Sequence, residues 1–228
     1  TEEIREKKEP KRLPVWACIL LFALGLFVCM GLYGTIGFGL LSLILGDEAR
    51  HPGLLVYTVT EANMLLSVLT PAVILLYFER RPFSDLGLTL KGHVRGLWYG
   101  LLVAMLLYLI GFGLSLAIGE VEVTGFQFDP LNLLGTFVFC LLVALTEEIM
   151  MRGYILGRLL HTRMNKFLAL FVSALLFALL HIFNPNVAFL PMLNLVIAGM
   201  LIGASYLYTR NLCFPISLHL FWNWIQGP

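Results

Sequence analysis

Charged residues are scarce in this chain, and their scarcity argues against an ordinary soluble domain. Asp, Glu, Lys and Arg together make up 13% of its 228 residues, whereas soluble domains carry about 25%. Hydrophobic residues make up 59%. The net charge of +1 and the lack of a basic tract give no sign of a nucleic-acid partner. The composition therefore predicts a polytopic membrane protein whose main partner is the lipid bilayer.

Cysteine and metal-binding patterns are also sparse. The four cysteines lie in apolar stretches without CxxC spacing, so we interpret them as small buried hydrophobic residues. No HExxH motif is present. A zinc site in this chain would therefore have to be assembled from side chains of separate segments.

Long apolar runs, by contrast, fill most of the sequence. A membrane-spanning helix needs about 20 residues, and the uncharged run 14–46 exceeds that length. We expect it to hold one span and an extra piece, with a break in the glycine-rich stretch 31–39. Further runs lie at roughly 54–78, 96–119, 131–157, 167–183, 187–209 and 211–226. The predicted fold is all-α, a transmembrane bundle of seven helices, or eight if the first run is a hairpin.

One domain accounts for this pattern. Residues 1–13 form a polar head, and residues 14–228 form a single membrane-embedded domain. The segment 79–88 is amphipathic and is expected to lie in the membrane interface. With seven spans, the head and most other basic residues fall on one side, while the acidic loop 120–129 falls on the other. The positive-inside rule then predicts a cytoplasmic N-terminus.

The most informative residues are two adjacent glutamates in the run 131–157. A charged side chain at the centre of a spanning helix costs about 2.5–3.5 kcal/mol on insertion scales, so Glu147 and Glu148 indicate a function. On a helix, Glu148 and Arg152 share a face, and Glu147 points about 100° away. We therefore expect Arg152 to keep Glu148 ionised and Glu147 to act as an acid or base. Alternatively, Glu148 and Arg152 form a buried ion pair that only holds helices together and has no part in a reaction.

Two later runs also carry polar groups into the apolar interior, although residue counting places His181 deeper than Glu147 and His219. Phe177 and His181 share one helix face, and His219 and Asn223 share another. A single histidine at a helix end is more often an interfacial residue than a catalyst, and Trp222 and Trp224 beside Asn223 are typical of an aromatic belt. Taken together, three helices that carry polar groups into an apolar interior favour a shared site.

These residues resemble a known family. Glu147-Glu148-xxx-Arg152, Phe177-xxx-His181 and His219-xxx-Asn223 are similar, in this order, to the three motifs of the CAAX protease and bacteriocin-processing (CPBP, Abi) intramembrane endopeptidases. The resemblance covers about 80–226, which we take as the motif-bearing core. It implies about eight membrane helices, a site in a cavity open to lipid and cytosol, and a peptide or membrane-anchored protein as substrate. We expect an integral protein of a prokaryotic cytoplasmic membrane.

The resemblance and the chemistry together assign the catalytic roles. Glu147 is the expected general base, and His181 helps it to hold the attacking water. His219 and Asn223 are expected to donate hydrogen bonds to the oxyanion.

Three further residues are expected to support the catalytic ones. Glu148 and Arg152 position the site, and Phe177 packs beneath His181. The resemblance favours a glutamate-activated water without a cofactor. A zinc-dependent protease with Glu147, His181 and His219 as metal ligands is the alternative.

Two other classes of function remain open. A transporter or proton relay would be expected to show paired repeats with broken helices, and the sequence shows none. A non-catalytic scaffold or immunity protein would be expected to lack Glu147, His181 or His219, and all three are present. The substrate is left open between a prenylated tail, a leader peptide and a membrane-protein tail. Glu61 and Asn194 lie in predicted spans outside any motif, and Glu61 either hydrogen-bonds within the bundle or lines a cavity.

Overall fold

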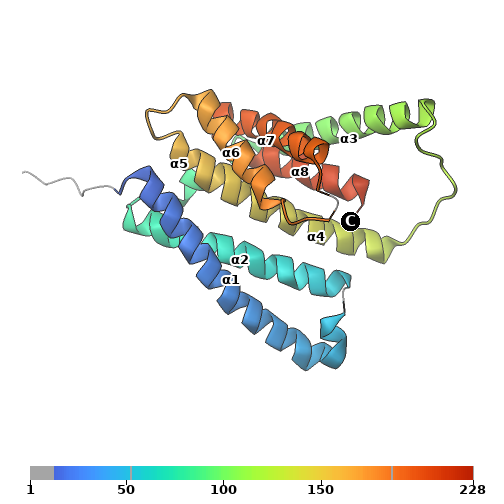
Figure 1. The fold of residues 1–228 in the computed structure, drawn as a ribbon, viewed down its shortest axis with the longest axis horizontal. Helices are drawn as coiled ribbons and strands as arrows, with labels where there is room; N and C mark the ends of the chain where they lie inside the picture. Colours follow the sequence, from blue (N-terminus) through green and yellow to red (C-terminus); the bar gives the residue numbers. More distant parts are fainter. Residues whose placement is uncertain (1–12, 52, 186, 228) are drawn as a thin grey trace, which may run out of the picture.

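A computed structural model describes residues 13–51, 53–185 and 187–227, and this part of the chain forms helices and no strands (Figure 1). The elements are α1 (Val15–Leu45), η1 (Gly46–Arg50), α2 (Leu54–Phe78), η2 (Phe83–Leu86), α3 (Val94–Ala117), α4 (Pro130–Glu148), η3 (Ile149–Leu156), α5 (Gly157–Leu159), α6 (Lys166–Leu180), α7 (Phe189–Thr209) and α8 (Cys213–Gln226). The predicted polar head lies outside the described residues, except for Leu13.

The helices have the lengths and composition of membrane spans. Five of those in the described residues are long and apolar enough to cross a bilayer: 15–50, 54–78, 94–117, 130–159 and 189–209. α4, η3 and α5 follow one another without a gap and make up the fourth of these. α6 has 15 residues and α8 has 14, fewer than the roughly 20 that span a bilayer. The prediction of an all-α membrane protein is confirmed.

The predicted break in the first apolar run is wrong. α1 continues as one α-helix from Val15 to Leu45 and ends only at Gly46, where φ is +59°. A Cβ added at Gly31, Gly34 or Gly39 would meet nothing within 4 Å. Because glycine in a helix costs only about 1 kcal/mol relative to alanine, these residues do not stop the helix. The bundle therefore has no N-terminal hairpin.

Close helix contacts in the bundle occur at glycines. A Cβ at Gly100 of α3 would lie 2.6 Å from the Ser217 Cβ and 2.7 Å from the Leu218 nitrogen of α8. A Cβ at Gly199 of α7 would lie 3.0 Å from the Ala174 Cβ of α6. In lipid, helices associate largely through such close packing of small residues. These contacts hold α8 close to α3 and α7 close to α6.

Several loops meet at one end of the bundle. The Leu212 nitrogen donates to the Gly87 carbonyl at 2.9 Å, and the Arg158 Nη1 atom lies 2.5 Å from the Glu79 Oε2 atom. The segment 79–93 therefore lies beside the α5–α6 and α7–α8 connections. This agrees with the expectation that most basic residues fall on one side, and the cytoplasmic assignment of this end stays a prediction.

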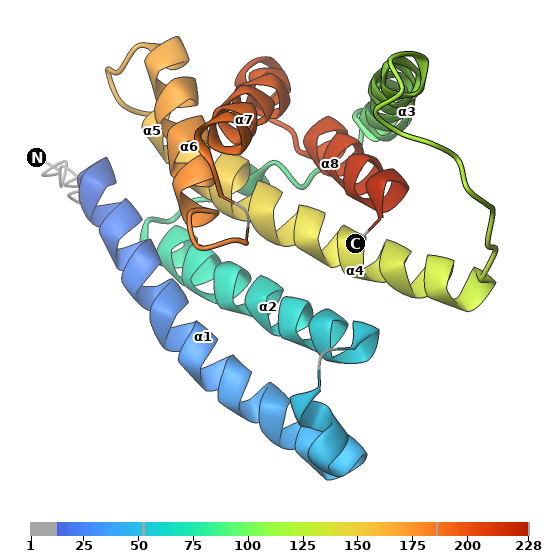
Figure 2. The same cartoon turned by 45° about the vertical axis from the view of Figure 1, so that its right-hand side comes forward.

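α4 occupies the middle of the molecule. It packs against α2 on one side and α8 on the other, while α1 and α3 lie farther out (Figure 2). Side chains on different faces of α4 can therefore reach different neighbouring helices.

Candidate active site

The two adjacent glutamates lie where the fourth span changes from an α-helix to a π-helix. α4 ends at Glu148, and the π-helical turn η3 runs from Ile149 to Leu156. Every residue of η3 is buried. A Cβ at Gly153 would lie 2.8 Å from the Leu86 carbonyl oxygen, so the turn also packs closely on segment 79–93. π-helical turns inside helices are frequent at functional sites.

Glu148 is completely buried and bonded to Arg152. The Arg152 Nη1 atom donates to the Glu148 Oε1 atom at 2.7 Å, and the two side chains are 1% and 0% exposed. The Arg152 Nη2 atom also donates to the Gly199 carbonyl of α7 at 3.1 Å. The predicted contact between Glu148 and Arg152 is confirmed, and the pair also ties the fourth span to α7.

Glu147 points to a different set of partners, as its place on the helix predicted. Its Oε1 atom lies 3.8 Å from the His181 Nε2 atom, and its Oε2 atom lies 3.6 Å from the His219 Nε2 atom. Its side chain is 22% exposed. Both distances exceed those of a direct hydrogen bond. The glutamate thus faces both histidines without a direct hydrogen bond to either.

His181 follows the last residue of α6. Its Nδ1 atom lies 2.9 Å from the Phe177 carbonyl oxygen. Because a carbonyl has no proton to give, Nδ1 carries the hydrogen and donates it. A neutral imidazole then has its lone pair on Nε2, the atom that faces Glu147.

The Phe177 ring lies among the polar groups of the site. Its centroid lies 4.8 Å from that of His181 and 4.7 Å from the Arg152 guanidinium carbon. The latter distance is that of a cation–π contact. The Phe177 ring also meets the His219 ring edge-on, with centroids 6.3 Å apart. Phe177 therefore packs beneath His181 as expected, and it also holds Arg152 from one face.

His219 of α8 lies between the two glutamates. Its Nδ1 atom is 2.8 Å from the Glu148 Oε1 atom. An ionised carboxylate only accepts, so Nδ1 donates here as well. In both histidines the Nδ1 hydrogen is used for positioning and Nε2 faces Glu147.

Two cavities flank these residues. One, of about 340 Å³, is lined by Glu147 and His181 with residues of α1, α2 and α6. The other, of about 280 Å³, is lined by His219 and Asn223 with residues of α3, α6 and α7. Phe177 lines both. The proposed base and the proposed oxyanion donors therefore line different hollows on two sides of one site.

The structure adds groups that the motifs do not contain. The Gly199 carbonyl accepts from Arg152, Glu61 lines the cavity of Glu147, and Asn194 lines the cavity of Asn223. Glu61 and Asn194 could be singled out from the sequence, because they are polar residues inside apolar spans. No sequence signal identifies a backbone carbonyl such as that of Gly199.

Comparison with known proteins gave one family match, and it covers the segment that carries these site residues. Neither the curated proteins nor the solved structures yielded a match. Residues 129–225 match the family model described as "Type II CAAX prenyl endopeptidase Rce1-like". The match runs from the N-cap of α4 through most of α8 and contains all three motifs, whereas α1 to α3 lie outside it. Residues 129–225 are thus similar to CAAX-type endopeptidases, and the five long apolar helices belong to an integral membrane protein.

Proposed function

We propose that this chain is an intramembrane endopeptidase in which Glu147 and His181 activate a water molecule. The observation that carries the proposal is the position of the Glu147 carboxylate, 3.8 Å from the His181 Nε2 atom and 3.6 Å from the His219 Nε2 atom. The family match supports the reaction class, because it is to a CAAX endopeptidase.

Glu147 suits the role of general base better than Glu148. Glu148 is fully buried, and its Oε1 atom already accepts hydrogen bonds from Arg152 and His219. Glu147 has no arginine or lysine partner among the described residues, its side chain is 22% exposed, and it lines a cavity of about 340 Å³. A base needs access to the proton it removes, and only Glu147 has it.

The Glu147 Oε1 and His181 Nε2 atoms are 3.8 Å apart, so one water molecule placed beside them can contact both. Polar contacts longer than 3.5 Å are often bridged by water. Such a water donates one hydrogen to the Glu147 carboxylate and the other to the free Nε2 atom of His181. One of its lone pairs then points away from both residues and is available for attack on a carbonyl carbon.

The reaction follows from this arrangement. As the water oxygen bonds to the carbonyl carbon, its proton passes to Glu147 and the carbonyl oxygen becomes an oxyanion. When the tetrahedral intermediate collapses, protonated Glu147 gives its proton to the leaving nitrogen and the C–N bond breaks. The products are a carboxylic acid and an amine, and Glu147 is again a carboxylate.

Asn223 and His219 serve the oxyanion. Both line the second cavity, and the Asn223 amide can donate in any protonation state of the site. Neutral His219 uses its only N–H on Glu148, so it donates from Nε2 as an imidazolium. Glu148 then orients that ring and balances its charge.

A zinc protease is the second candidate, and one observation favours it. Histidines that bind zinc usually donate their other N–H to a carboxylate or a carbonyl, as His181 and His219 do here. Glu147, His181 and His219 also have suitable donor atoms. However, no group of three or more His, Cys, Asp or Glu in the described part of the chain is arranged to hold a metal ion. The catalytic steps proposed above do not involve a metal ion.

The substrate we propose is a peptide segment at the membrane. The cavity of Glu147 is lined mostly by apolar residues of four helices, so it suits a peptide held close to lipid. A prenylated tail, which the family description suggests, a leader peptide and the tail of a membrane protein all meet this condition.

Comparison of protein termini in membranes tests the proposal. Cells lacking the protein would receive the wild type, Glu147→Gln or Glu120→Gln, and new N- and C-termini of membrane proteins would be identified by mass spectrometry. Glu120 is an exposed carboxylate in the α3–α4 loop, so its variant controls for the loss of one charge. We expect the same new termini with the wild type and Glu120→Gln, and none with Glu147→Gln. Identical termini with folded Glu147→Gln would contradict the proposal.

A further inference from the structure

Glu61 of α2 lies in the cavity of the proposed base, although it belongs to no motif. The cavity of about 340 Å³ that Glu147 and His181 line is also lined by Glu61. α2 lies outside the segment that matches the family model. Glu61 therefore has no role in the proposed reaction and lies outside the family match.

The charges around this cavity have one sign. Glu61 and Glu147 are its carboxylates, and no lysine or arginine is among the described residues that line it. Arg152 is engaged by Glu148 and the Gly199 carbonyl. The Glu61 carboxylate has no Lys, Arg or His partner in the described part of the chain.

The nearest part of α4 offers Glu61 little compensation. Thr146 lines the same cavity, but its hydroxyl has a single hydrogen, for which Glu61 competes with the Leu142 carbonyl at 2.8 Å. A carboxylate in an apolar environment is costly unless something donates to it. A bound group with a positive charge would supply those hydrogen bonds and offset the like charges of Glu61 and Glu147.

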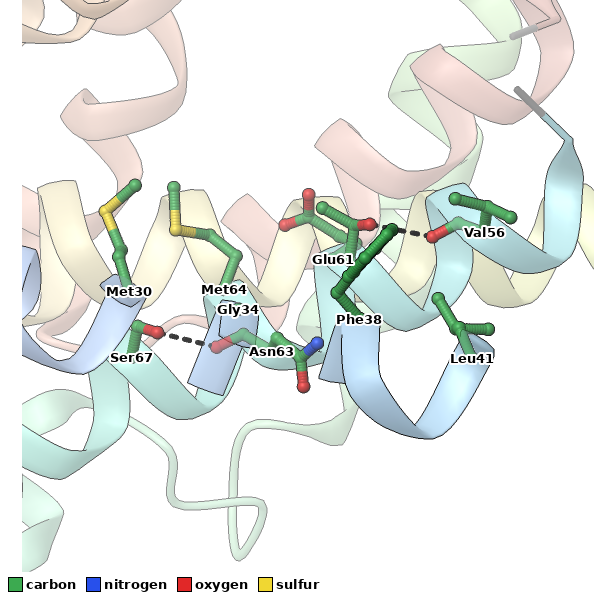
Figure 3. A pocket seen from close by; sticks show the side chains of 10 residues that line it. Met30, Gly34, Phe38, Leu41, Val56, Glu61, Asn63, Met64 and Ser67 are labelled. Atoms are coloured by element: carbon green, nitrogen blue, oxygen red, sulfur yellow. Dashed lines mark hydrogen bonds between the residues drawn. The ribbon is translucent and has the colours of Figure 1, made fainter. Parts of the chain in front are cut away.

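Glu61 lines more than one cavity. Glu61, Met30 and Met64 also line a third cavity, of about 240 Å³, between α1 and α2. In Figure 3 these three side chains point to one side of the α1–α2 pair, and Asn63 points to the other. Ligand pockets commonly measure about 300–1,000 Å³. Methionine lining adapts to varied apolar side chains, and Glu61 is the charged group that the two cavities share.

We propose that Glu61 is a specificity-determining residue that selects substrates with a lysine, an arginine or a free amino group at one fixed position from the scissile bond. The inference rests on the proposed peptidase function. The substrate flank that enters the cavity between α1, α2 and α6 places its cationic group at Glu61. A flank with a carboxylate at that position is rejected by Glu61 and Glu147 together.

Cleavage-site profiling tests this assignment. Purified protein in detergent would be incubated with a mixed library of synthetic peptides, and both ends of the products would be sequenced by mass spectrometry. The variants are Glu61→Gln, which keeps size, Glu61→Lys, which reverses the charge, and Glu120→Gln as a surface control. Glu147→Gln identifies cleavage by a contaminant. Thermal melting checks that each variant is folded.

We expect the wild type and Glu120→Gln to prefer Lys or Arg over Asp or Glu at one position by about tenfold or more in relative kcat/KM. Glu61→Gln should lose this preference, and Glu61→Lys should favour Asp or Glu there. If Glu61→Lys does not fold, Glu61→Gln alone decides. An unchanged profile in folded Glu61→Gln overturns the inference and leaves the peptidase function intact. If no wild-type cleavage depends on Glu147, the proposed function fails, and the inference fails with it.

Discussion

The Nδ1 atom of His219 lies 2.8 Å from the Oε1 atom of Glu148, and this contact distinguishes the roles of the two adjacent glutamates. It makes Glu148 a partner of both His219 and Arg152. Glu147 stays 3.6 Å from the other nitrogen of the same ring. One glutamate therefore orients the histidine, and the other faces it without a direct hydrogen bond.

Arg152→Ala should destabilise the protein more than the loss of its partner does. The substitution leaves a buried carboxylate without its cation, which costs roughly 3–5 kcal/mol. It also removes the bond to the Gly199 carbonyl. The double variant Arg152→Ala/Glu148→Gln removes the uncompensated charge and should recover part of the loss. Thermal unfolding in detergent measures both, and a double variant no more stable than Arg152→Ala would contradict the pairing.

Asn223→Ala should slow the enzyme without inactivating it. Losing one oxyanion donor typically lowers kcat by about 10²–10³-fold, with little change in KM because the ground-state carbonyl is held less tightly. Asn194→Ala is the matched control, since Asn194 lines the same cavity from α7. We expect its kcat to stay within a few-fold of the wild type. Equal losses in the two variants would remove Asn223 from the oxyanion role.

Gly100→Ala should lower both stability and activity. The new Cβ would lie 2.7 Å from the backbone nitrogen of Leu218, so α3 and α8 must move apart, and overpacking of this kind costs about 1–3 kcal/mol. α8 carries His219 and Asn223, so the shift reaches the site. Gly111→Ala in the same helix meets nothing within 4 Å and should leave both quantities unchanged. Similar melting temperatures for the two variants would show that the close contact does not matter.

The membrane orientation can be tested by labelling. Ser84 and Thr124 are exposed and lie in the loops before and after α3. Single cysteines at these positions, with the four native cysteines replaced, should react with an impermeant maleimide from opposite sides of the membrane. We expect Thr124→Cys to be labelled in intact cells and Ser84→Cys only after permeabilisation. Labelling of both from the same side would exclude the predicted topology.

The sequence predicted the helices well because hydrophobic length is a local property. The expected runs 54–78 and 187–209 correspond to α2 and α7, with bounds Leu54–Phe78 and Phe189–Thr209. The depth of His181 was harder to predict. Counted from its loop, it lay deeper than Glu147, but α6 ends at Leu180 and the two side chains still approach to 3.8 Å. How short helices pack against a long one depends on contacts distant in sequence.

The faces of the site residues were also predictable, whereas their surroundings were not. Helical spacing correctly separated Glu147 from Glu148 and paired Glu148 with Arg152. The π-helical turn at Ile149–Leu156 has no signature in the hydrophobic pattern, since that pattern is the same for a span of either kind. Glu61 could be recognised as unusual, but its place beside Glu147 follows only from the packing of α2 on α4.

If Glu147 and His181 activate water without a metal ion, activity should survive metal removal. Purified protein would be dialysed against a chelator, its zinc content measured, and its cleavage of a peptide chosen from the terminus comparison followed with and without added zinc. In the zinc-dependent alternative, the nucleophile is a zinc-bound water, whose pKa is near 7. A zinc enzyme should therefore be inactive once the chelator has removed the metal. We predict zinc well below one equivalent and unchanged cleavage that Glu147→Gln abolishes. Stoichiometric zinc, with activity lost on chelation and restored by adding zinc back, would contradict the account.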